Sequence, residues 1–206
     1  MIHILPDIVI NKLKAGEVVE RPSSVIKELV ENSLDAQATH ISIDIHDGGK
    51  QLILAQDDGT GIEYSDSELI LHRYATSKIT SDEDLDRLGS YGFRGEALAS
   101  IAEVSSITVE TKTKFADIGF QIIKDHQLNE IKKIALPYYH GTKIMIRELF
   151  ANTPVRKKFL KSSQTEYFYC YQMCLDFALA RYDIHWTIKK NGTLVHDLPA
   201  TPDMQS

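Results

Sequence analysis

The sequence predicts an α+β fold, a two-layer α/β sandwich whose sheet is mixed and mostly antiparallel. Three observations support this prediction. Segments with helical periodicity come early in the chain, strand-like segments joined by short turns dominate the middle, and one long apolar helical segment comes late. The regular alternation of strand and helix that is typical of a parallel sheet is not seen.

Two helices are expected before the first strands. A short one covers about residues 7–14, and a longer one begins near Pro22 and includes KELVENSLDA (27–36). In the longer helix an apolar side lies opposite a polar stripe at positions i, i+3, i+4 and i+7. The apolar residues are Val25, Ile26, Leu29, Val30 and Leu34, and the polar ones are Glu28, Glu31, Asn32 and Asp35. By spacing alone, such a stripe is more often a solvated face than a functional site.

A β-hairpin and a long irregular segment follow. HISIDIH (40–46) and KQLILAQD (50–57) alternate around a Gly48-Gly49 turn, which predicts two antiparallel strands. Residues 58–95 show no sustained period and are rich in Gly, Ser, Thr and Asp. An irregular stretch of this length inside a compact domain is usually a functional loop or lid.

The second half of the chain is predicted to supply most of the sheet. GEALASIAEV (95–104) has helical periodicity, and Thr153 before Pro154 marks the start of another helix. The strand-like runs are 105–112, 117–124, 128–136 and 142–149, residues 165–181 form the late helix, and 185–198 form a hairpin with an Asn191-Gly192 turn.

Composition limits the class of protein. The chain has 206 residues, of which 43% are apolar and 25% charged, so it fits one large domain, or one domain with an appendage, with a real core and the composition of a soluble protein. Its net charge of −6 argues against a main surface that binds nucleic acid. No apolar run reaches the roughly 18 residues that a membrane span needs, and the N-terminus lacks the pattern of a secretory signal. We therefore expect a cytoplasmic protein without a membrane partner.

Two smaller groups of residues have ordinary explanations. Cys170 and Cys174 lie one turn apart in an apolar helical segment, which predicts buried reduced thiols rather than a disulfide or a zinc site. The basic run Arg156, Lys157, Lys158 and Lys161 is a local exception to the negative charge. A solvated helix end is the favoured interpretation, and contact of this run with DNA stays open.

Three glycine-bearing or hydroxyl-bearing segments could bind a nucleotide, although the chain has no P-loop. DDGTGI (57–62) follows an apolar strand, so Asp57 could offer a carboxylate acceptor while the glycines let a flat ring approach. YGFRGEAL (91–98) runs into a helix start, where backbone N–H groups and Arg94 favour a phosphate. ATSK (75–78) adds two hydroxyls and a lysine. Each segment alone is also a common turn, helix start or loop.

The order of these motifs carries a resemblance. EL-x-x-N (28–32), D-x-G-x-G (57–61), TSK, GFRGEAL and Gly141-Thr142 together resemble the ATPase superfamily of gyrase, Hsp90, histidine kinases and MutL. Within it the chain is closely similar to the MutL family, over about residues 2–198. The blocks that carry the similarity are AGEVVERP (15–22), KELVENSLDA (27–36), ATSKI (75–79), GFRGEALASI (92–101) and NTPVRKKFL (152–160). The resemblance implies a Bergerat-type ATP-binding fold.

The resemblance also implies roles for individual residues. Glu28 matches the general base that polarises the water attacking the γ-phosphate, and Asn32 matches the ligand of Mg²⁺. One protein oxygen suffices when phosphates and waters complete an octahedral shell. Asp57 matches the carboxylate that accepts from the adenine amino group, with Gly61 beneath the base and Thr142 supporting it through water. Glu31 and Asp35 match no such role; Glu31 is expected to be solvated and Asp35 structural.

The phosphates are expected to bind a lid. The lid residues are Thr76, Ser77, Lys78, Gly92, Phe93, Arg94 and Gly95. Such a sparse set is enough, because phosphoryl transfer asks mainly for positioning and charge stabilisation. Three positions depart from the family pattern: Asp58 stands where Asn is common, Tyr74 where His is common and Tyr91 where Leu is usual.

The function implied is that of the ATP-binding lobe of a MutL-type DNA mismatch repair protein. Residues 1–198 would form this lobe and 199–206 the start of a linker to a second lobe, which in the family supplies a lysine to the γ-phosphate. We expect Mg²⁺-dependent ATP hydrolysis that is weak without that lysine. ATP would order residues 58–95 and the N-terminal segment and bring two copies together.

The expected partners are ATP, Mg²⁺, a second copy of the chain, a mismatch-recognition protein and a downstream nuclease or helicase, with weak DNA binding by the full-length protein. Two alternatives stay open. One is another ATPase of the same superfamily, such as a topoisomerase subunit or a chaperone, which AGEVVERP and GFRGEALASI disfavour. The other is a non-catalytic DNA-binding or scaffold module that keeps the fold, which the intact Glu28 and Asn32 disfavour.

Overall fold

The computed structural model describes residues 19–72, 75, 96–125, 128–136 and 140–202. Some predictions therefore lie outside the described residues. These are the helix at about 7–14, the departures Tyr74 and Tyr91, and the lid residues Thr76, Ser77, Lys78, Gly92, Phe93, Arg94 and Gly95.

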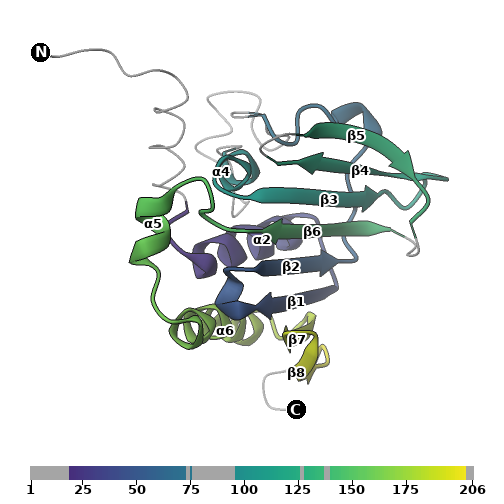
Figure 1. The fold of residues 1–206 in the computed structure, drawn as a ribbon. Helices are drawn as coiled ribbons and strands as arrows, with labels where there is room; N and C mark the ends of the chain where they lie inside the picture. Colours follow the sequence, from purple (N-terminus) through teal and green to yellow (C-terminus); the bar gives the residue numbers. More distant parts are fainter. Residues whose placement is uncertain (1–18, 73–74, 76–95, 126–127, 137–139, 203–206) are drawn as a thin grey trace, which may run out of the picture.

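The described residues form one eight-stranded sheet with the order β5-β4-β3-β6-β2-β1-β7-β8 (Figure 1). The strands are β1 (His40–His46), β2 (Leu52–Asp57), β3 (Ser106–Lys112), β4 (Gly119–Lys124), β5 (Asn129–Ile134), β6 (Gly141–Arg147), β7 (His185–Lys190) and β8 (Thr193–Leu198). Neighbours are antiparallel except β1 and β7, which pair in parallel. The predicted mixed, mostly antiparallel sheet is confirmed.

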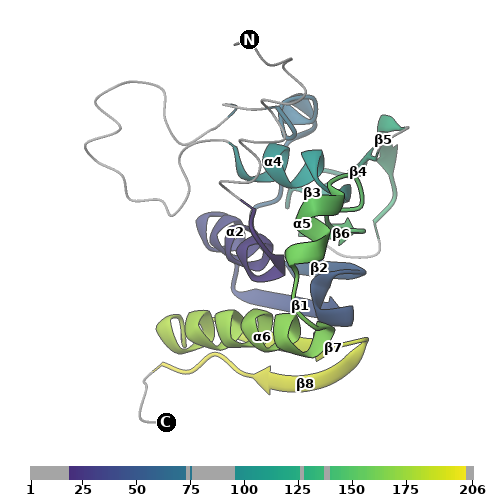
Figure 2. The same ribbon diagram turned by 60° about the vertical axis from the view of Figure 1, so that its left-hand side comes forward.

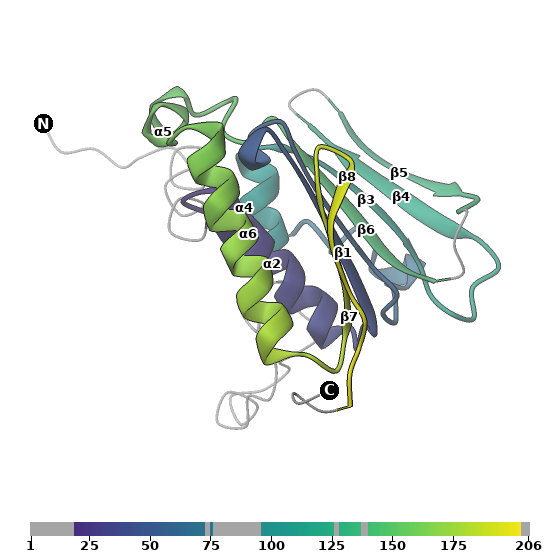
Figure 3. The same ribbon diagram turned by 90° about the horizontal axis from the view of Figure 1, so that it is seen from below.

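Helices α2 (Pro22–Asp35), α4 (Ala97–Glu103) and α6 (Ser163–Ala180) lie together on one face of the sheet, which gives two layers (Figure 3). Helix α5 (Pro154–Phe159) and the short 3₁₀ turns η1 (Asp47–Gly49) and η2 (Tyr64–Asp66) complete the described elements. The predicted α+β fold class is confirmed. None of the described helices is long and apolar enough to cross a membrane.

The core lies between the two layers. Strand residues that alternate along the sequence are buried under the helix layer, as the period of two predicts. They include Ile41, Ile43 and Ile45 of β1, Ile53 and Ala55 of β2, Ile107 and Val109 of β3, and Ile144 and Ile146 of β6. From α2, the predicted apolar side (Val25, Ile26, Leu29, Val30 and Leu34) is buried.

The two predicted hairpins are present. β1 and β2 pair antiparallel around η1, and β7 and β8 pair around Asn191 and Gly192. Asn191 has φ +51° and Gly192 φ +78°, which are the positive angles that a two-residue hairpin turn of the primed type requires. Here the turn chemistry of the sequence and the observed backbone agree.

Two other predictions are also confirmed. Cys170 and Cys174 are fully buried free thiols, and burial raises the pKa of Cys174 to about 12, so the thiol stays protonated and unreactive. The basic run belongs to α5 and the residues after it, where Lys157, Lys158 and Lys161 are exposed. Arg156 is partly buried, so the solvated part of the run consists of the lysines.

Candidate functional site

Helix α2 presents the first part of the site. The helix begins after Arg21, whose backbone is extended, and Pro22 lies in its first turn. The buried apolar side of α2 determines which of its residues face away from the sheet. Glu28 and Asn32 lie one turn apart and therefore project on the same side. The Glu28 side chain is only 22% exposed. Helix α2 lies between α4 and α6 (Figure 2). The polar stripe is thus less exposed than the open face of an isolated helix.

The prediction that Glu31 is solvated is wrong. Glu31 is 8% exposed, and its carboxylate lies 2.8 Å from the ammonium group of Lys27. Lys27 also lies 3.5 Å from the carboxylate of Glu28. Partial burial acts to lower the pKa of Lys27, but the hydrogen bond with Glu31 and the charges of both glutamates outweigh it and raise that pKa. Lys27 therefore stays charged between the two carboxylates.

Asp57 forms the second part of the site, at the end of β2. Its Oδ1 accepts hydrogen bonds from the backbone N–H groups of Gly59, at 2.9 Å, and Thr142, at 3.3 Å. Its Oδ2 accepts from the hydroxyl of Ser33, at 2.9 Å. Burial is the largest effect and raises the pKa of Asp57, while these three hydrogen bonds act in the opposite direction. The carboxylate is thus held in a fixed, largely dry position.

Ser33 is a site residue that the sequence analysis missed. It lies on α2 directly after Asn32, and its bond to Asp57 joins the helix that carries Glu28 to the end of β2. The sequence signal is its place directly after Asn32, three and four residues after the apolar Val30 and Leu29. That position alone also fits a serine that bonds the Leu29 carbonyl one turn back, which Ser33 approaches at 3.1 Å.

Thr111 is the second missed residue. Asp57, Thr142 and Thr111 are direct cross-strand neighbours on β2, β6 and β3, and we call them the polar row. They alternate in step with the buried residues of their strands, so they lie on the helix-covered face at the edge of the core. Thr111 is fully buried, and its hydroxyl lies 3.0 Å from that of Thr142.

Two glycines allow the backbone to close around the polar row. Gly61 has φ +71°, and a Cβ there would clash with the carbonyl of Lys112. Gly141 has φ +107°, and a Cβ there would clash with the carbonyl of Asp57. Any other residue at either position would be strained and would push the loop after β2 away from β3 or β6. Gly61 is therefore required by the fold, whatever lies against it.

Asp58, one of the three departures from the family pattern, has a structural role. Its carboxylate accepts from the backbone N–H groups of Thr39, at 2.7 Å, and His40, at 2.8 Å, and from the Thr39 hydroxyl, at 2.6 Å. Partial burial acts to raise the pKa of Asp58, but these hydrogen bonds lower it overall. Asp58 thus fixes the end of β2 to the start of β1. Its role is structural and differs from the one expected of Asp57.

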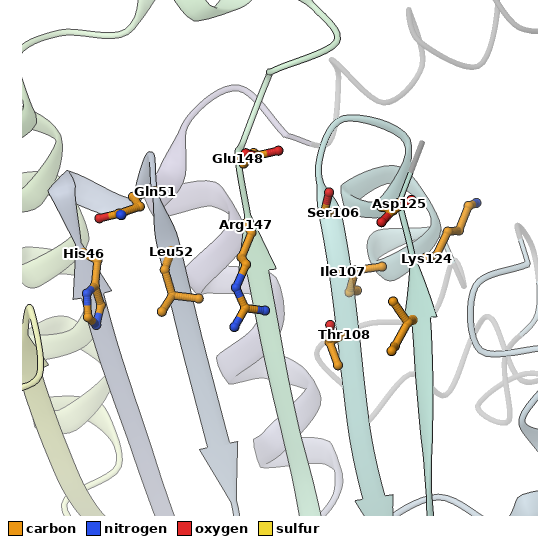
Figure 4. A pocket seen from close by; sticks show the side chains of 11 residues that line it. His46, Gln51, Leu52, Ser106, Ile107, Thr108, Lys124, Asp125, Arg147 and Glu148 are labelled. Carbon is orange, nitrogen blue, oxygen red and sulfur yellow. The ribbon is translucent and has the colours of Figure 1, made fainter. Parts of the chain in front are cut away.

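A separate hollow of about 510 Å³ lies at the opposite ends of the strands (Figure 4). Arg147 at the end of β6 lies in its middle, with Leu52 of β2 and Thr108 of β3 beside it. Leu52 is five residues from Asp57 along β2, about 17 Å at the usual rise of a strand. This hollow is therefore separate from the candidate site. Its lining combines apolar, acidic and basic side chains and does not indicate one class of ligand.

The described part of the candidate site offers a metal few protein ligands. Among the described residues, no group of three or more His, Cys, Asp or Glu side chains could hold a metal ion. Asn32, partly exposed and one turn from Glu28, offers one carboxamide oxygen. This fits Mg²⁺ that is bound mainly by phosphates and waters, and it does not fit a metal that needs an all-protein cage.

Comparison with known proteins decides the family. The profile of the histidine kinase-, DNA gyrase B- and HSP90-like ATPases matches residues 20–149. The chain belongs to this ATPase family. The matching region contains Glu28, Asn32 and Ser33 on α2 as well as the whole polar row, so the site lies entirely within the part of the chain that defines the family.

Within this ATPase family the chain is similar to MutL proteins. It is 47% identical to the DNA mismatch repair protein MutL of Shewanella sediminis, over 97% of this chain and 32% of that protein. It is also 47% identical to the MutL of Neisseria meningitidis, over 97% of this chain and 30% of that protein. The chain thus spans about a third of the length of these relatives.

Solved structures agree. The MutL ATPase domain of Aquifex aeolicus, solved in complex with ADP, superimposes with a TM-score of 0.73 at 31% identity, over 89% of this chain and 65% of that chain. The N-terminal domain of a DNA repair protein gives a TM-score of 0.77 at 25% identity, over 95% of this chain and 58% of that one. The predicted MutL-type ATPase domain is confirmed.

Proposed function

We propose that this chain is the ATP-binding and ATP-hydrolysing lobe of a DNA mismatch repair protein. The observation that carries the proposal is the hydrogen bond of Ser33 to Asp57. It fixes the helix that presents Glu28 and Asn32 against the carboxylate expected to bind adenine, so one rigid unit spans both ends of a nucleotide. Membership of the ATPase family and the ADP complex of the Aquifex aeolicus domain support the same function.

In this proposal the base lies against the polar row, with Asp57 accepting from its amino group. Glu28 would polarise the attacking water, and its limited exposure together with nearby Lys27 keeps it in one place. Asn32 would hold Mg²⁺ with one oxygen, and the ion would supply charge neutralisation at the phosphates. The lid residues 76–78 and 92–95 would contact the phosphates; they lie outside the described residues and rest on the sequence motifs.

The finer parts of the cycle are also proposals. The sequence predicts that ATP orders residues 58–95, but residues 58–72 already make defined contacts within the chain, among them the bond of Ile62 to Thr111. The proposal is therefore that ATP orders the rest of this segment and the N-terminal segment, which promotes contact between two copies, and that hydrolysis reverses this. The paired lobes would signal to a mismatch-recognition protein and to a downstream nuclease or helicase in the cytoplasm. Residues 1–198 would form the lobe and 199–206 the start of a linker, and the end of β8 at Leu198 supports that boundary.

The test is a calorimetric titration of the 206-residue chain with ATP and Mg²⁺, followed by measurement of ATP turnover. We expect saturable binding of one ATP per chain and slow turnover that rises in a longer form containing the next lobe. A chain that binds no nucleotide would favour a non-catalytic scaffold or DNA-binding module. Binding without turnover in either form would refute hydrolysis while keeping nucleotide binding.

A further inference from the structure

The hydroxyl of Thr111 contacts three polar groups but has only one hydrogen. This determines the direction of the hydrogen bonds in the polar row. Its oxygen lies 3.0 Å from the backbone nitrogen of Ile62, 3.1 Å from the carbonyl oxygen of Gly141 and 3.0 Å from the hydroxyl oxygen of Thr142. A hydroxyl has one hydrogen to donate and two lone pairs that accept. Thr111 is fully buried, so water does not replace any of these partners.

Only one arrangement satisfies all three contacts. The N–H of Ile62 can only donate, so it uses one lone pair of Thr111. The carbonyl of Gly141 can only accept, so it takes the single hydrogen of Thr111. The remaining lone pair must accept from Thr142, whose own hydrogen is therefore committed to Thr111. Thr142 is left with two lone pairs and no hydrogen to offer a ligand.

Asp57 is limited in a similar way. Its Oδ1 already accepts from Gly59 and Thr142, and its Oδ2 accepts from Ser33, which leaves one open acceptor position on Oδ2. Thr142 donates its backbone N–H to this same carboxylate, so the two residues adjoin. The site therefore offers acceptors, and neither of these side chains offers a donor.

We propose that Thr111 is a specificity-determining positioning residue, which fixes Thr142 as an acceptor and so makes the site select purines with a 6-amino group over purines with a 6-oxo group. This inference rests on the proposed nucleotide site and names the residue behind its base preference. A 6-amino group donates to the two acceptors, directly or through an ordered water. A 6-oxo group meets acceptors only. A buried polar group without a partner costs more free energy than a typical hydrogen bond contributes.

The decisive variant is Thr111→Val, which keeps the shape of the side chain and removes the hydroxyl. The hydroxyl of Thr142 is then free to rotate and donate, so a 6-oxo purine gains a partner. We expect the preference for ADP over inosine diphosphate, measured as the ratio of the two dissociation constants, to fall at least about fivefold, the equivalent of about one hydrogen bond. Calorimetry with ADP, and with inosine diphosphate in competition against it, gives both constants.

Two controls separate specificity from stability. Thr111→Ser keeps the hydroxyl and should keep the preference within about twofold of the native ratio, the equivalent of a few tenths of a kcal/mol. Thr108→Val makes the same change on β3 but on the face away from the helices, and it should leave the ratio unchanged. A variant that is only destabilised would weaken both nucleotides alike and would not move their ratio.

The outcomes distinguish this inference from the proposed function. A native chain that binds neither nucleotide would overturn the proposed function itself. A native chain that prefers ADP, with an unchanged ratio in Thr111→Val, would overturn the role of Thr111 alone. If Thr111→Val does not fold, the same ratio of dissociation constants is measured in Thr142→Val. This variant removes the hydroxyl that Thr111 orients. An unchanged ratio there overturns the inference equally.

Discussion

The base end and the phosphate end of the candidate site differ in how much of their geometry the protein supplies by itself. At the base end, Asp57 accepts three hydrogen bonds from protein groups, and Thr111 joins the loop at Ile62 to β6. At the phosphate end, Glu28 and Asn32 lie on a sheltered helix face, and their expected partners are the phosphates, Mg²⁺ and the lid. In the proposed function, the base end would thus be built before a nucleotide arrives, and the phosphate end would be completed by the nucleotide.

This difference suggests that the two ends contribute to different steps of the proposed function. A preorganised base end gives affinity and selectivity for the nucleotide, since its groups need no rearrangement on binding. A phosphate end that the nucleotide itself completes would distinguish ATP from ADP in the proposed function, because its expected contacts depend on the γ-phosphate. Substitutions at the two ends should therefore affect different measurements: base-end changes should alter binding, and phosphate-end changes should alter turnover.

The largest effect is expected at Glu28. In Glu28→Ala we expect ATP turnover to fall by about 10²- to 10⁴-fold, the usual contribution of a general base, while ATP affinity stays near the native value. Steady-state turnover and calorimetric titration on the same preparation measure both. Glu130→Ala, an exposed glutamate on β5 outside the candidate site, is the matched control. Native turnover in Glu28→Ala would remove Glu28 from the mechanism and end the contrast between the two ends.

The next effect is expected in Asp57→Asn, at the base end. The amide oxygen can still accept from Gly59 and Thr142, and the amide nitrogen can donate to Ser33, whose hydrogen then bonds Leu29. The variant should fold, but it replaces an acceptor with a donor where the base binds. We expect ADP affinity to fall by about 10- to 100-fold, the range for a lost hydrogen bond to a charged group.

Thermal unfolding provides the check on this variant. Because burial raises the pKa of Asp57, ionisation of the folded protein opposes its stability, and that effect grows as pH rises through the folded pKa. Asp57→Asn removes this ionisation and should not lower the melting temperature at neutral pH. A variant that binds ADP like the native chain would show that Asp57 does not contact the base.

A smaller effect is expected at Asn32. In Asn32→Ala the gain in ATP affinity that Mg²⁺ provides should fall about tenfold, the equivalent of about 1.4 kcal/mol, because one protein oxygen leaves the shell of the ion. Titrations with ATP in the presence of Mg²⁺ and of a chelator measure this gain. ADP affinity without metal should stay near the native value. An unchanged Mg²⁺ effect would count against Asn32 as the ligand.

The smallest effect is expected at Ser33. Ser33→Ala removes one of the three hydrogen bonds to Asp57, so ADP affinity should fall about fivefold, the equivalent of about 1 kcal/mol. Turnover at saturating ATP should stay near the native value, since Glu28 is unchanged. Ser33→Thr is not a safe control inside this packed helix face, so Ser65→Ala, on an exposed turn, serves instead. A large loss of turnover would show that the two ends are not separable.

The sequence predicted well those features that depend on local periodicity and turn chemistry. The helix around Glu28, both hairpins and the strands β3 and β6 were predicted, because neighbouring residues alone determine them. Asp57 and Thr142 were named from the resemblance, and the structure places them side by side. Their roles toward a nucleotide stay predictions.

Features that depend on distant parts of the chain were missed or wrong. Thr111 looks like any strand residue until the register of β3 against β6 is known, and Ser33 acquires its partner only when β2 ends beneath α2. Glu31 was expected in water because an isolated amphipathic helix has one wet face. In the fold α2 lies between α4 and α6, and Glu31 is 8% exposed and paired with Lys27.

The bond between Thr142 and Asp57 also bears on when the protein becomes able to bind its ligand. The two residues are 85 positions apart in the chain. Such distant contacts form late in folding, because closing a long loop must precede any gain from the contact. At the usual rate of about 5–20 residues per second, a nascent chain would expose α2 and β2 for several seconds before β6 is synthesised. Nucleotide binding would then mark the chains whose sheet has closed, and ADP added during refolding should capture only these.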